Sequence, residues 1–491
     1  MMITSEQLIV LCPFLILLLT VITIILLISY YRNHFSIFLC SIIGLVFTLL
    51  FLYIVQKNIP IDITILFHID KYSFLYILVV IVSSIISCIF SYFALKNSHY
   101  NKEEFYLLLV LSTIGCISLI ISNHMFSLFI GMELIFLPTL GLISYTYYKK
   151  RSLEAALKYM ILSCSISVLA LFGIALVYSI TGSLTFSSVI YECVVSSLSP
   201  NYIFLCGLGL IILSFFFKLS VFPFHIWISD VYEGTEPTVL MYFSTAVKIA
   251  VFSVFFKIFI FLTFFNVKFF HIVFEVISCC SIIFGSFMAL FQTNIKRFLG
   301  YSSISQFGYL LILLLSSKNF DFSLEAVGIY LISYFLSSIG IFGLISVLSN
   351  LNYTWKCDFI KFYHGLFWKN SVLSTILSIF LFSFSGIPIT IGFIGKFYIL
   401  SLIIRENLWL LGIMFLIGSI LGIYSYLSIV TKFYLYPQVF SKEDKIVLDI
   451  YSKNCILFLL AISLLILVLG IYPNLIIGIM STYKPILFVN L

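Results

Sequence analysis

The chain has 491 residues, of which 62% are hydrophobic and only 9% are charged, and its mean hydropathy is +1.21. Soluble globular domains carry roughly 25% charged residues. This composition therefore excludes a soluble globular domain and predicts a helical protein that crosses a membrane repeatedly. The net charge of +7 is spread over short loops without a long basic run, so nucleic acid is not an expected partner.

The start of the chain and its composition bear on where the protein is made. Residues 8–31 are long enough to span a bilayer, and neither an Arg-rich transit segment nor a cleavable leader precedes them. We therefore expect synthesis at the site of insertion, in a bacterium or inside an organelle. The 54 Phe and 31 Tyr residues are typical of an AT-biased coding genome, which favours the organelle.

Hydropathy predicts about fourteen membrane-spanning helices of roughly 20 residues each, separated by short loops. They cover residues 8–31, 35–56, 72–95, 104–122, 125–148, 153–181, 202–229, 237–262, 271–292, 298–317, 323–349, 371–404, 408–435 and 453–478. Most loop lysines and arginines follow odd-numbered spans. The positive-inside rule then places both termini outside and these loops in the matrix or cytoplasm.

Two of the predicted spans are too long to be straight. Residues 202–229 contain Pro223, and residues 371–404 contain the sequence Ser385-Gly386-Ile387-Pro388. Each has a lysine near its break, Lys218 or Lys396. Broken helices five spans apart predict two structural repeats with a site at each break, and two unrelated kinked helices are the alternative.

The repeats divide the chain into four parts. They are residues 1–103 for the first three helices, 104–262 for the first repeat, 263–435 for the second repeat, and 436–491 for a C-terminal loop and helix.

Charged residues inside the spans are candidates for function, because a central ammonium costs about 2.5–3.5 kcal/mol on insertion scales. At a helical rise of 1.5 Å per residue, Glu133 lies about 12 Å into its predicted span, and Lys248 lies about 16 Å along its helix from Pro237. Burial lowers the proton affinity of a lysine and a nearby carboxylate raises it. Movement of Glu133 relative to Lys218 would therefore switch a proton, which Lys248 and Lys396 would pass on through water.

Each of these groups also has a structural interpretation. Lys158 follows Glu154 by four residues and can form an i,i+4 ion pair, while Lys218 can belong to a buried structural pair. Lys396 can extend toward the headgroups, and His225 can cap carbonyls that the break at Pro223 frees.

Five motifs lie in order between about residue 105 and residue 435. They read MELIFLPTLGLISY, EAALKYMIL, KLSVFPFHIWISDVYEGTEPTVLMYFSTAVK, NIKRFLGYSSISQFGYLLI and FSGIPITIGFIGKFYIL. These motifs resemble the subunit 2 family of respiratory complex I, the NADH:ubiquinone oxidoreductase. That family consists of antiporter-like subunits that pump protons. The first three spans and the last fit it by hydropathy only.

The resemblance implies a fourteen-helix core with two inverted repeats, and proton translocation coupled to quinone reduction in partner subunits. It implies that Glu133 and Lys218 form an ion pair, and that Lys248 is the central channel lysine. Lys396 would then be the lysine of the second half-channel. Lys158 matches a further lysine of the family, and His225 lies within its Pro-Phe-His break.

Two positions favour subunit 2 over its relatives, and two depart from the family pattern. Lys396 stands where subunit 4 carries glutamate, and Lys248 stands where subunit 5 carries histidine. Glu236 is an extra charge beside a displaced proline, and Ile389 stands where a second proline is common. The departures bear on the geometry of the loops and not on the lysines.

We expect no cofactor in this chain, since it has no iron–sulfur cysteine spacing and no Gly-rich dinucleotide turn. The resemblance implies FMN, iron–sulfur clusters and quinone in partner subunits. It also implies lipids, the antiporter-like subunit 4 and the small membrane subunits near the quinone end as partners. The expected location is the mitochondrial inner membrane, with the bacterial inner membrane as the alternative. Other functions left open are an Mrp-type cation/proton antiporter subunit, a plastid relative that uses plastoquinone, and a structural membrane anchor.

Overall fold

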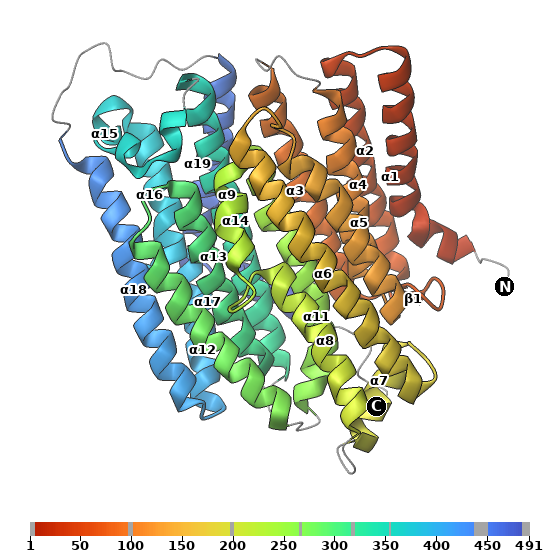
Figure 1. The fold of residues 1–491 in the computed structure, drawn as a ribbon. Coiled ribbons are helices and arrows are strands. Elements are labelled where there is room, and N and C mark those ends of the chain that lie inside the picture. Colours follow the sequence, from red (N-terminus) through yellow and green to blue (C-terminus); the bar gives the residue numbers. More distant parts are fainter. Residues whose placement is uncertain are drawn as a thin grey trace. The chain divides into compact units, whose positions relative to one another are not determined.

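The computed structural model describes residues 5–96, 102–196, 201–264, 268–315, 320–352, 355–436 and 450–483. Helices dominate these segments (Figure 1). Within the described residues, 13 helices are long and apolar enough to cross a membrane. The predicted span 371–404 is not among the 13 because it is divided into two shorter helices. The prediction of an all-α protein that crosses the membrane many times is confirmed.

The chain forms two compact units. The first comprises residues 1–219, 242–268 and 483–491, and the second comprises residues 220–241 and 269–482. The segment 220–241 packs with the second unit, and the predicted boundaries of the repeats stay a prediction.

Long helices and one two-stranded hairpin build the first unit. Its elements are α1 (Ser5–Tyr30), α2 (His34–Val55), η1 (Gln56–Asn58), β1 (Ile61–Asp62), β2 (His68–Ile69), α3 (Lys71–Leu95), α4 (Glu103–Ile120), α5 (Met125–Ile143), α6 (Lys150–Thr181), α7 (Phe186–Ser196), α8 (Tyr202–Leu219), η2 (Phe243–Val247) and α11 (Lys248–Phe264). In the hairpin, Ile61 pairs with Ile69 and Asp62 pairs with His68, antiparallel. The sequence analysis did not predict this hairpin.

Two facing glycines bring α6 and α8 together. A Cβ on Gly173 would lie 2.7 Å from the Gly207 carbonyl oxygen, and a Cβ on Gly207 would lie 2.9 Å from the Gly173 carbonyl oxygen. Small residues allow such backbone contact between membrane helices. The contact fixes α8 against α6, and therefore fixes the position of the lysine at the end of α8.

The second unit contains the remaining helices. They are α9 (Ile226–Gly234), α10 (Pro237–Tyr242), α12 (Lys268–Leu290), α13 (Ile295–Ile312), η3 (Leu313–Leu315), α14 (Phe320–Asn352), η4 (Trp355–Asp358), η5 (Ile360–Tyr363), α15 (Leu366–Lys369), α16 (Ser371–Ser385), α17 (Ile391–Arg405), α18 (Trp409–Tyr434), α19 (Ile450–Ile471) and α20 (Asn474–Thr482). The displaced Pro237 is the first residue of α10, a position where its missing N–H costs no helical hydrogen bond.

Both predicted breaks are present. Helix α8 ends at Leu219 and α9 begins at Ile226, with Ser220 between them at φ 59°. Helix α16 ends at Ser385 and is followed by Gly386 at φ 78°, and Ile389 lies at φ 81° before α17 begins. A left-handed backbone is unusual for a β-branched residue and inaccessible to proline, whose φ is close to −65°. The Ile389 departure from the family pattern is therefore compatible with this turn, and a proline there is not.

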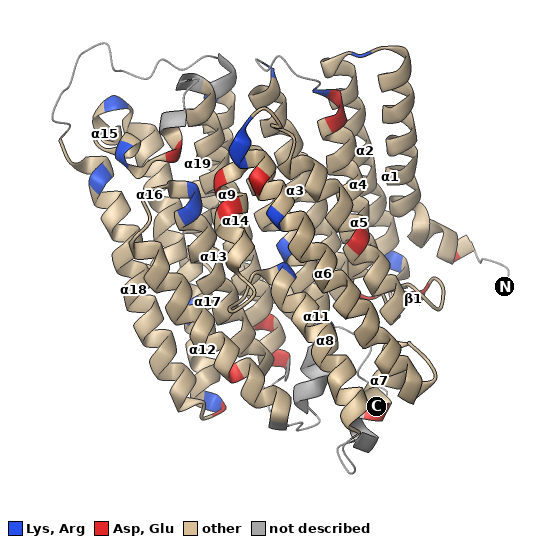
Figure 2. Ribbon diagram, in the orientation of Figure 1, with Lys and Arg blue, Asp and Glu red and all other residues tan. Residues whose placement is uncertain are grey.

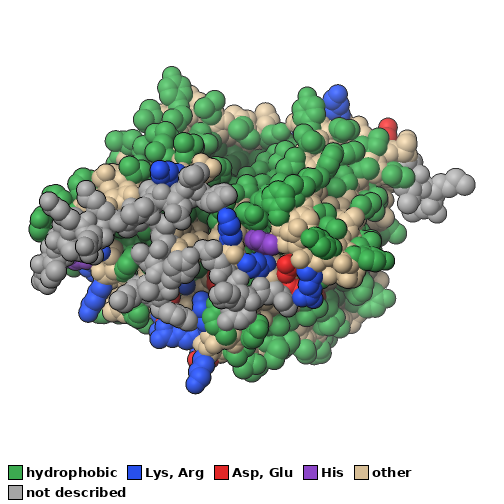
Figure 3. Space-filling model, turned by 90° about the horizontal axis from the view of Figure 1, so that it is seen from above, with side chains coloured by type: hydrophobic (Ala, Val, Ile, Leu, Met, Phe, Trp, Pro, Cys, Tyr) green, Lys and Arg blue, Asp and Glu red, His purple; other side chains and the backbone are tan. Residues whose placement is uncertain are grey.

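Many of the lysine and arginine residues lie toward one end of the helices of each unit (Figure 2). In the first unit Arg32 lies between α1 and α2, and Lys149 precedes α6. In the second unit Lys361 and Lys369 lie before α16. Figure 3 shows the molecule from that end, where basic side chains lie beside hydrophobic, acidic and histidine side chains. The hairpin lies at the opposite end of the first unit.

Candidate functional site

Lys218 lies in the last turn of α8, beside the first break, and its side chain is buried. Its Nζ donates a hydrogen bond of 2.8 Å to Ser163 Oγ on α6. The ammonium also lies 4.8 Å from the centre of the Phe136 ring and 5.8 Å from that of Tyr159. A hydroxyl and two aromatic faces therefore hold this charge, and each aromatic face contributes about 0.5–2 kcal/mol.

Glu133 lies on α5, half-buried, about one turn before Phe136. Its charge acts on both Lys218 and Tyr159. Among the residues that the structure describes, the carboxylate makes no direct ion pair with Lys218, whose hydrogen bond goes to Ser163. In this conformation the interaction predicted between Glu133 and Lys218 is therefore one of charge at longer range.

Lys248 directly follows the π-helical turn η2, which interrupts the helix between α10 and α11. Its exposed fraction is 0%. Turns of this kind are rare and are found frequently at functional sites. A fully enclosed ammonium is costly to keep in a membrane helix. The position therefore suits a lysine that changes its protonation state during function.

Lys396 lies on α17, just past the second break, and is buried. Its Nζ donates a hydrogen bond of 2.7 Å to the carbonyl oxygen of Ser385, the last residue of α16. The ammonium also lies 5.4 Å from the centre of the Tyr309 ring. Carbonyls at the end of a helix lack helical donors, so the lysine satisfies a backbone group that the break sets free.

A buried amide that the sequence analysis missed lies at the same break. Gln306 on α13 donates hydrogen bonds to the Phe384 carbonyl at 3.3 Å and to the Tyr426 hydroxyl at 3.4 Å. Its side-chain oxygen accepts a hydrogen bond from the Tyr330 hydroxyl. The signal that identifies this residue in the sequence is an amide in the middle of an apolar span.

The structure places Lys158 and His225 in different surroundings from the three buried lysines. Lys158 on α6 forms an ion pair of 2.7 Å with Glu154, and its side chain is 43% exposed. His225 precedes α9 in the second unit, where its ring stacks on Phe222 at 5.3 Å and lies 4.4 Å from Phe284. Within the described residues, Nδ1 of this histidine has no hydrogen-bond partner.

Ion pairs fasten the second part of the first broken helix within the second unit. Arg297 on α13 pairs with Asp230 at 2.9 Å and also with Glu233, both on α9. Lys296 pairs with Asp358 at 2.8 Å and donates to the carbonyl of Thr235 at 3.1 Å. These contacts explain why the segment 220–241 belongs to the second unit, which hydropathy alone does not indicate.

The candidate site residues are titratable side chains, and no metal site is found beside them in the described residues. In the described part of the chain, no cluster of three or more His, Cys, Asp or Glu residues is arranged to hold a metal ion. Lysine amines can take up and release protons, and burial makes their protonation sensitive to small changes in nearby charge.

Replacement of Ser163 by alanine tests the contact with Lys218. A hydrogen bond to a charged group contributes about 1.5–3 kcal/mol, so we expect any activity that needs the Lys218 ammonium to fall by roughly tenfold. The measurement is proton transport by the assembled protein in liposomes. Ser167→Ala is the matched control, because the exposed Ser167 hydroxyl bonds only within its own helix, to the Cys164 carbonyl. Equal transport by the two variants contradicts the prediction.

Comparisons with known proteins identify relatives of the chain. Residues 122–422 match the family described as NADH:quinone oxidoreductase/Mrp antiporter, TM. The NADH-quinone oxidoreductase subunit N of Buchnera aphidicola subsp. Acyrthosiphon pisum (strain APS) is 49% identical over 484 residues, which cover 98% of this chain and 99% of that protein. The subunit N of Buchnera aphidicola subsp. Schizaphis graminum (strain Sg) is 47% identical over 491 residues, 99% of this chain and 100% of that protein.

Three solved structures share the fold. A chain of respiratory complex I from Thermus thermophilus with bound aureothin has a TM-score of 0.79 at 24% identity, covering 95% of this chain and 98% of its own. A chain of the archaeal membrane-bound sulfane sulfur reductase has a TM-score of 0.84 at 21% identity, covering 97% of both. A chain of the Mrp complex from Dietzia sp. DQ12-45-1b has a TM-score of 0.81 at 17% identity, covering 98% of this chain and 97% of its own. Because the family match covers more than half of the sequence and the bacterial relatives align along nearly all of it, this chain belongs to the NADH:quinone oxidoreductase/Mrp antiporter family of transmembrane proteins.

Proposed function

We propose that this chain is a membrane-arm subunit of a bacterial NADH:quinone oxidoreductase and that it carries protons across the membrane. The observation that carries the proposal is the burial of three lysines at interruptions of membrane helices. Lys218 and Lys396 each lie beside a broken helix, and Lys248 follows a π-helical turn. The high identity to two subunits N, which are bacterial counterparts of subunit 2, supports the assignment.

In the proposed mechanism, Glu133 and Ser163 set the protonation of Lys218. The Ser163 hydroxyl accepts a hydrogen bond from the ammonium, and the Glu133 charge stabilises it at longer range. When Glu133 becomes protonated or moves away, the buried ammonium loses that stabilisation and releases its proton. Lys248 then takes up a proton in its enclosed position, and the charge on Lys248 disfavours reprotonation of Lys218 until the proton moves on.

Lys396 has the corresponding role at the second break. Its ammonium donates to the Ser385 carbonyl, and the loss of a proton leaves an amine that still donates to the same oxygen. The Gln306 amide and its tyrosine partners hold the neighbouring backbone in place. The break therefore keeps its geometry in both protonation states. Lys158 and His225 are proposed to act outside this sequence of steps, where Lys158 keeps its pair with Glu154 and His225 supports the turn.

The proposal assigns the redox chemistry to partner subunits. FMN, iron–sulfur clusters and quinone are proposed to lie there, and the partners proposed for this chain are the antiporter-like subunit 4 and the small membrane subunits near the quinone end. The bacterial inner membrane fits the relatives. The mitochondrial location expected from composition stays a prediction.

A second candidate function is that of an Mrp-type cation/proton antiporter subunit, favoured by the TM-score of 0.81 to a chain of the Mrp complex. Purification of the tagged chain from its native membranes in mild detergent distinguishes the two. We expect it to co-purify with an assembly that oxidises NADH, reduces quinone and acidifies one side of a liposome. Isolation with sodium/proton exchange activity and without redox partners overturns the first proposal and supports the second.

A further inference from the structure

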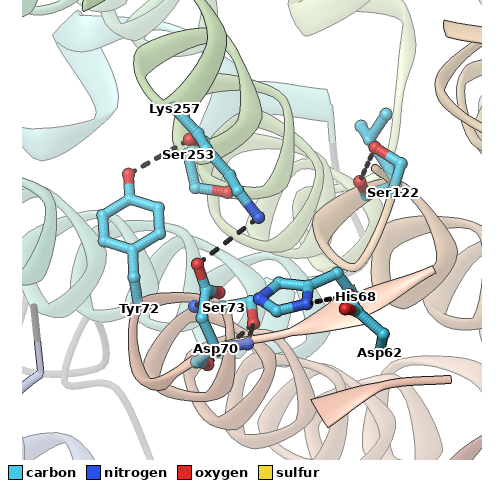
Figure 4. Close-up of polar contacts among 9 residues, drawn as sticks. Asp62, His68, Asp70, Tyr72, Ser73, Ser122, Ser253 and Lys257 are labelled. Atoms are coloured by element: carbon cyan, nitrogen blue, oxygen red, sulfur yellow. Dashed lines mark hydrogen bonds and ion pairs between the residues drawn. The ribbon is translucent and has the colours of Figure 1, made fainter. Parts of the chain in front are cut away.

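A second buried ion pair lies in the first unit, away from the lysines discussed above. Lys257 on α11 lies 3.5 Å from Asp70, measured from Nζ to Oδ2, and the side chains are 3% and 0% exposed. The sequence analysis did not single out Lys257, which lies near the end of the predicted span 237–262. The structure instead buries it, opposite the carboxylate that precedes α3 (Figure 4).

The pair continues through a histidine to the surface of the hairpin. His68 Nδ1 lies 2.5 Å from Asp62 Oδ1, and the Asp62 side chain is 76% exposed whereas that of His68 is 10% exposed. The ring of His68 lies between Asp62 and the Asp70–Ser73 turn (Figure 4). Four titratable groups thus run from a fully buried ammonium to an exposed carboxylate.

The inner part of this chain of groups contains three buried polar atoms without hydrogen bonds in the described structure. They are Lys257 Nζ, Asp70 Oδ2 and His68 Nε2. Buried polar groups are nearly always satisfied by protein or by ordered water. These three atoms lie on side chains that are close together in the first unit (Figure 4), and ordered water is the kind of partner that would satisfy them.

The backbone around the cluster is firmly fixed. Asp70 Oδ1 accepts from the Ser73 N–H at 3.1 Å, and the Ser73 hydroxyl lies 2.9 Å from the Asp70 N–H, which forms a capping box at the start of α3. The His68 N–H donates to the Ile121 carbonyl at 2.9 Å. One oxygen of Asp70 is thus used for capping, and the other faces Lys257.

The charge state of Asp70 depends on its partner. Burial alone would raise the pKa of Asp70, but the Lys257 charge and the hydrogen bonds with Ser73 hold that pKa below its ordinary value. If Lys257 gives up its proton, the main charge that favours the carboxylate disappears. Without the Lys257 charge beside it, the buried Asp70 carboxylate would be a better proton acceptor.

We propose that Lys257, Asp70, His68 and Asp62 form a proton relay that connects the interior of the first unit to solution at the hairpin end. This inference rests on the proposed function. In the relay an N–H bond of the Lys257 ammonium breaks and the proton passes through one water to Asp70 Oδ2. The Asp70 proton then passes to His68 Nε2, the His68 Nδ1 proton passes to Asp62, and Asp62 releases it to bulk water. Exchange with water restores the starting tautomer of His68, and a proton from the interior restores the ammonium.

The relay is a separate site from the pocket of Lys248. The two lysines lie nine residues apart on α11, which corresponds to about 14 Å along the helix and to opposite sides of it. Buried hydroxyls lie on the side of Lys257, where Tyr72 donates to the Ser253 carbonyl at 3.1 Å and its ring lies 4.7 Å from that of Tyr76.

The competing interpretation is a structural clip between α3 and α11. Asp70→Asn separates the two, because asparagine caps a helix as well as aspartate does but cannot carry a proton between Lys257 and His68. In the assembled complex in liposomes we expect normal assembly and a fall in NADH-driven proton pumping of about tenfold or more. Asp70→Glu, which restores a carboxylate, is expected to recover most of the pumping, and His68→Gln is expected to lose it.

Glu104→Gln is the matched control, since half-buried Glu104 pairs with exposed Arg32 at 3.4 Å at the other end of the same unit. Parent-level pumping by Asp70→Asn overturns the relay. If Asp70→Asn does not assemble, the double variant Asp70→Asn/Lys257→Met takes its place, because it removes both charges of the buried pair. Full pumping by the double variant overturns the relay, and a tenfold loss supports it.

Lys248→Met separates the relay from the proposed function. If Lys248→Met loses pumping and Asp70→Asn does not, only the relay is rejected. If both variants pump like the parent, the proposed function is rejected as well.

Discussion

Replacement of Lys248 by methionine is expected to abolish proton pumping while the complex still assembles. Methionine fills a similar volume in a site with 0% exposure, so the packing of α11 is largely preserved. Removal of a group that transfers protons typically costs a factor of about 100 to 10,000 in rate. The measurement is NADH-driven acidification in liposomes, together with native gel electrophoresis to confirm assembly.

Lys248→Arg sharpens this test. Arginine keeps a positive charge but does not release its proton in proteins, so pumping should be lost in this variant too. A lysine needed only for its charge would be replaced better by arginine than by methionine. Lys57→Met, at an exposed position in η1, is the control and should pump like the parent. Full pumping by Lys248→Met would refute the role proposed for Lys248.

Replacement of Gly392 by alanine is expected to destabilise the second break. A Cβ at Gly392 on α17 would lie 1.8 Å from the carbonyl oxygen of Ser383 on α16, which is far inside contact distance. The overlap is with backbone, so the two half-helices must separate, and overpacking of this kind typically costs about 1–3 kcal/mol or more. The shift would also move Lys396 away from the Ser385 carbonyl. We expect the amount of assembled complex to fall several-fold, measured by immunoblot and thermal unfolding.

The matched control for this change is Gly422→Ala. No heavy atom lies within 4 Å of a Cβ built on Gly422, which is on the neighbouring helix α18. Alanine is favoured over glycine inside a helix by about 1 kcal/mol, so this variant should be as stable as the parent or slightly more so. If Gly392→Ala accumulates and unfolds like Gly422→Ala, the close contact between α16 and α17 is not present in the protein.

The sequence by itself determined the class of the protein and the positions of its broken helices. Apolar stretches of a fixed minimum length report membrane spans because the bilayer thickness sets that length. Two spans too long to be straight, with Pro223 and Pro388 inside them, predicted the breaks, and a lysine lies near each one. The structure confirmed both breaks and the all-α fold.

Only the tertiary structure decided which groups meet. Gln306 reaches the Phe384 carbonyl of α16 from another helix, and Lys257 pairs with Asp70 across nearly 190 residues of sequence. Ion pairs with Arg297 assign α9 to the second unit although it continues the helix of Lys218. Hydropathy averages over a window and carries no information about which face of a helix meets which neighbour. Contacts between distant segments depend on side-chain packing in three dimensions, and one sequence read alone does not specify it.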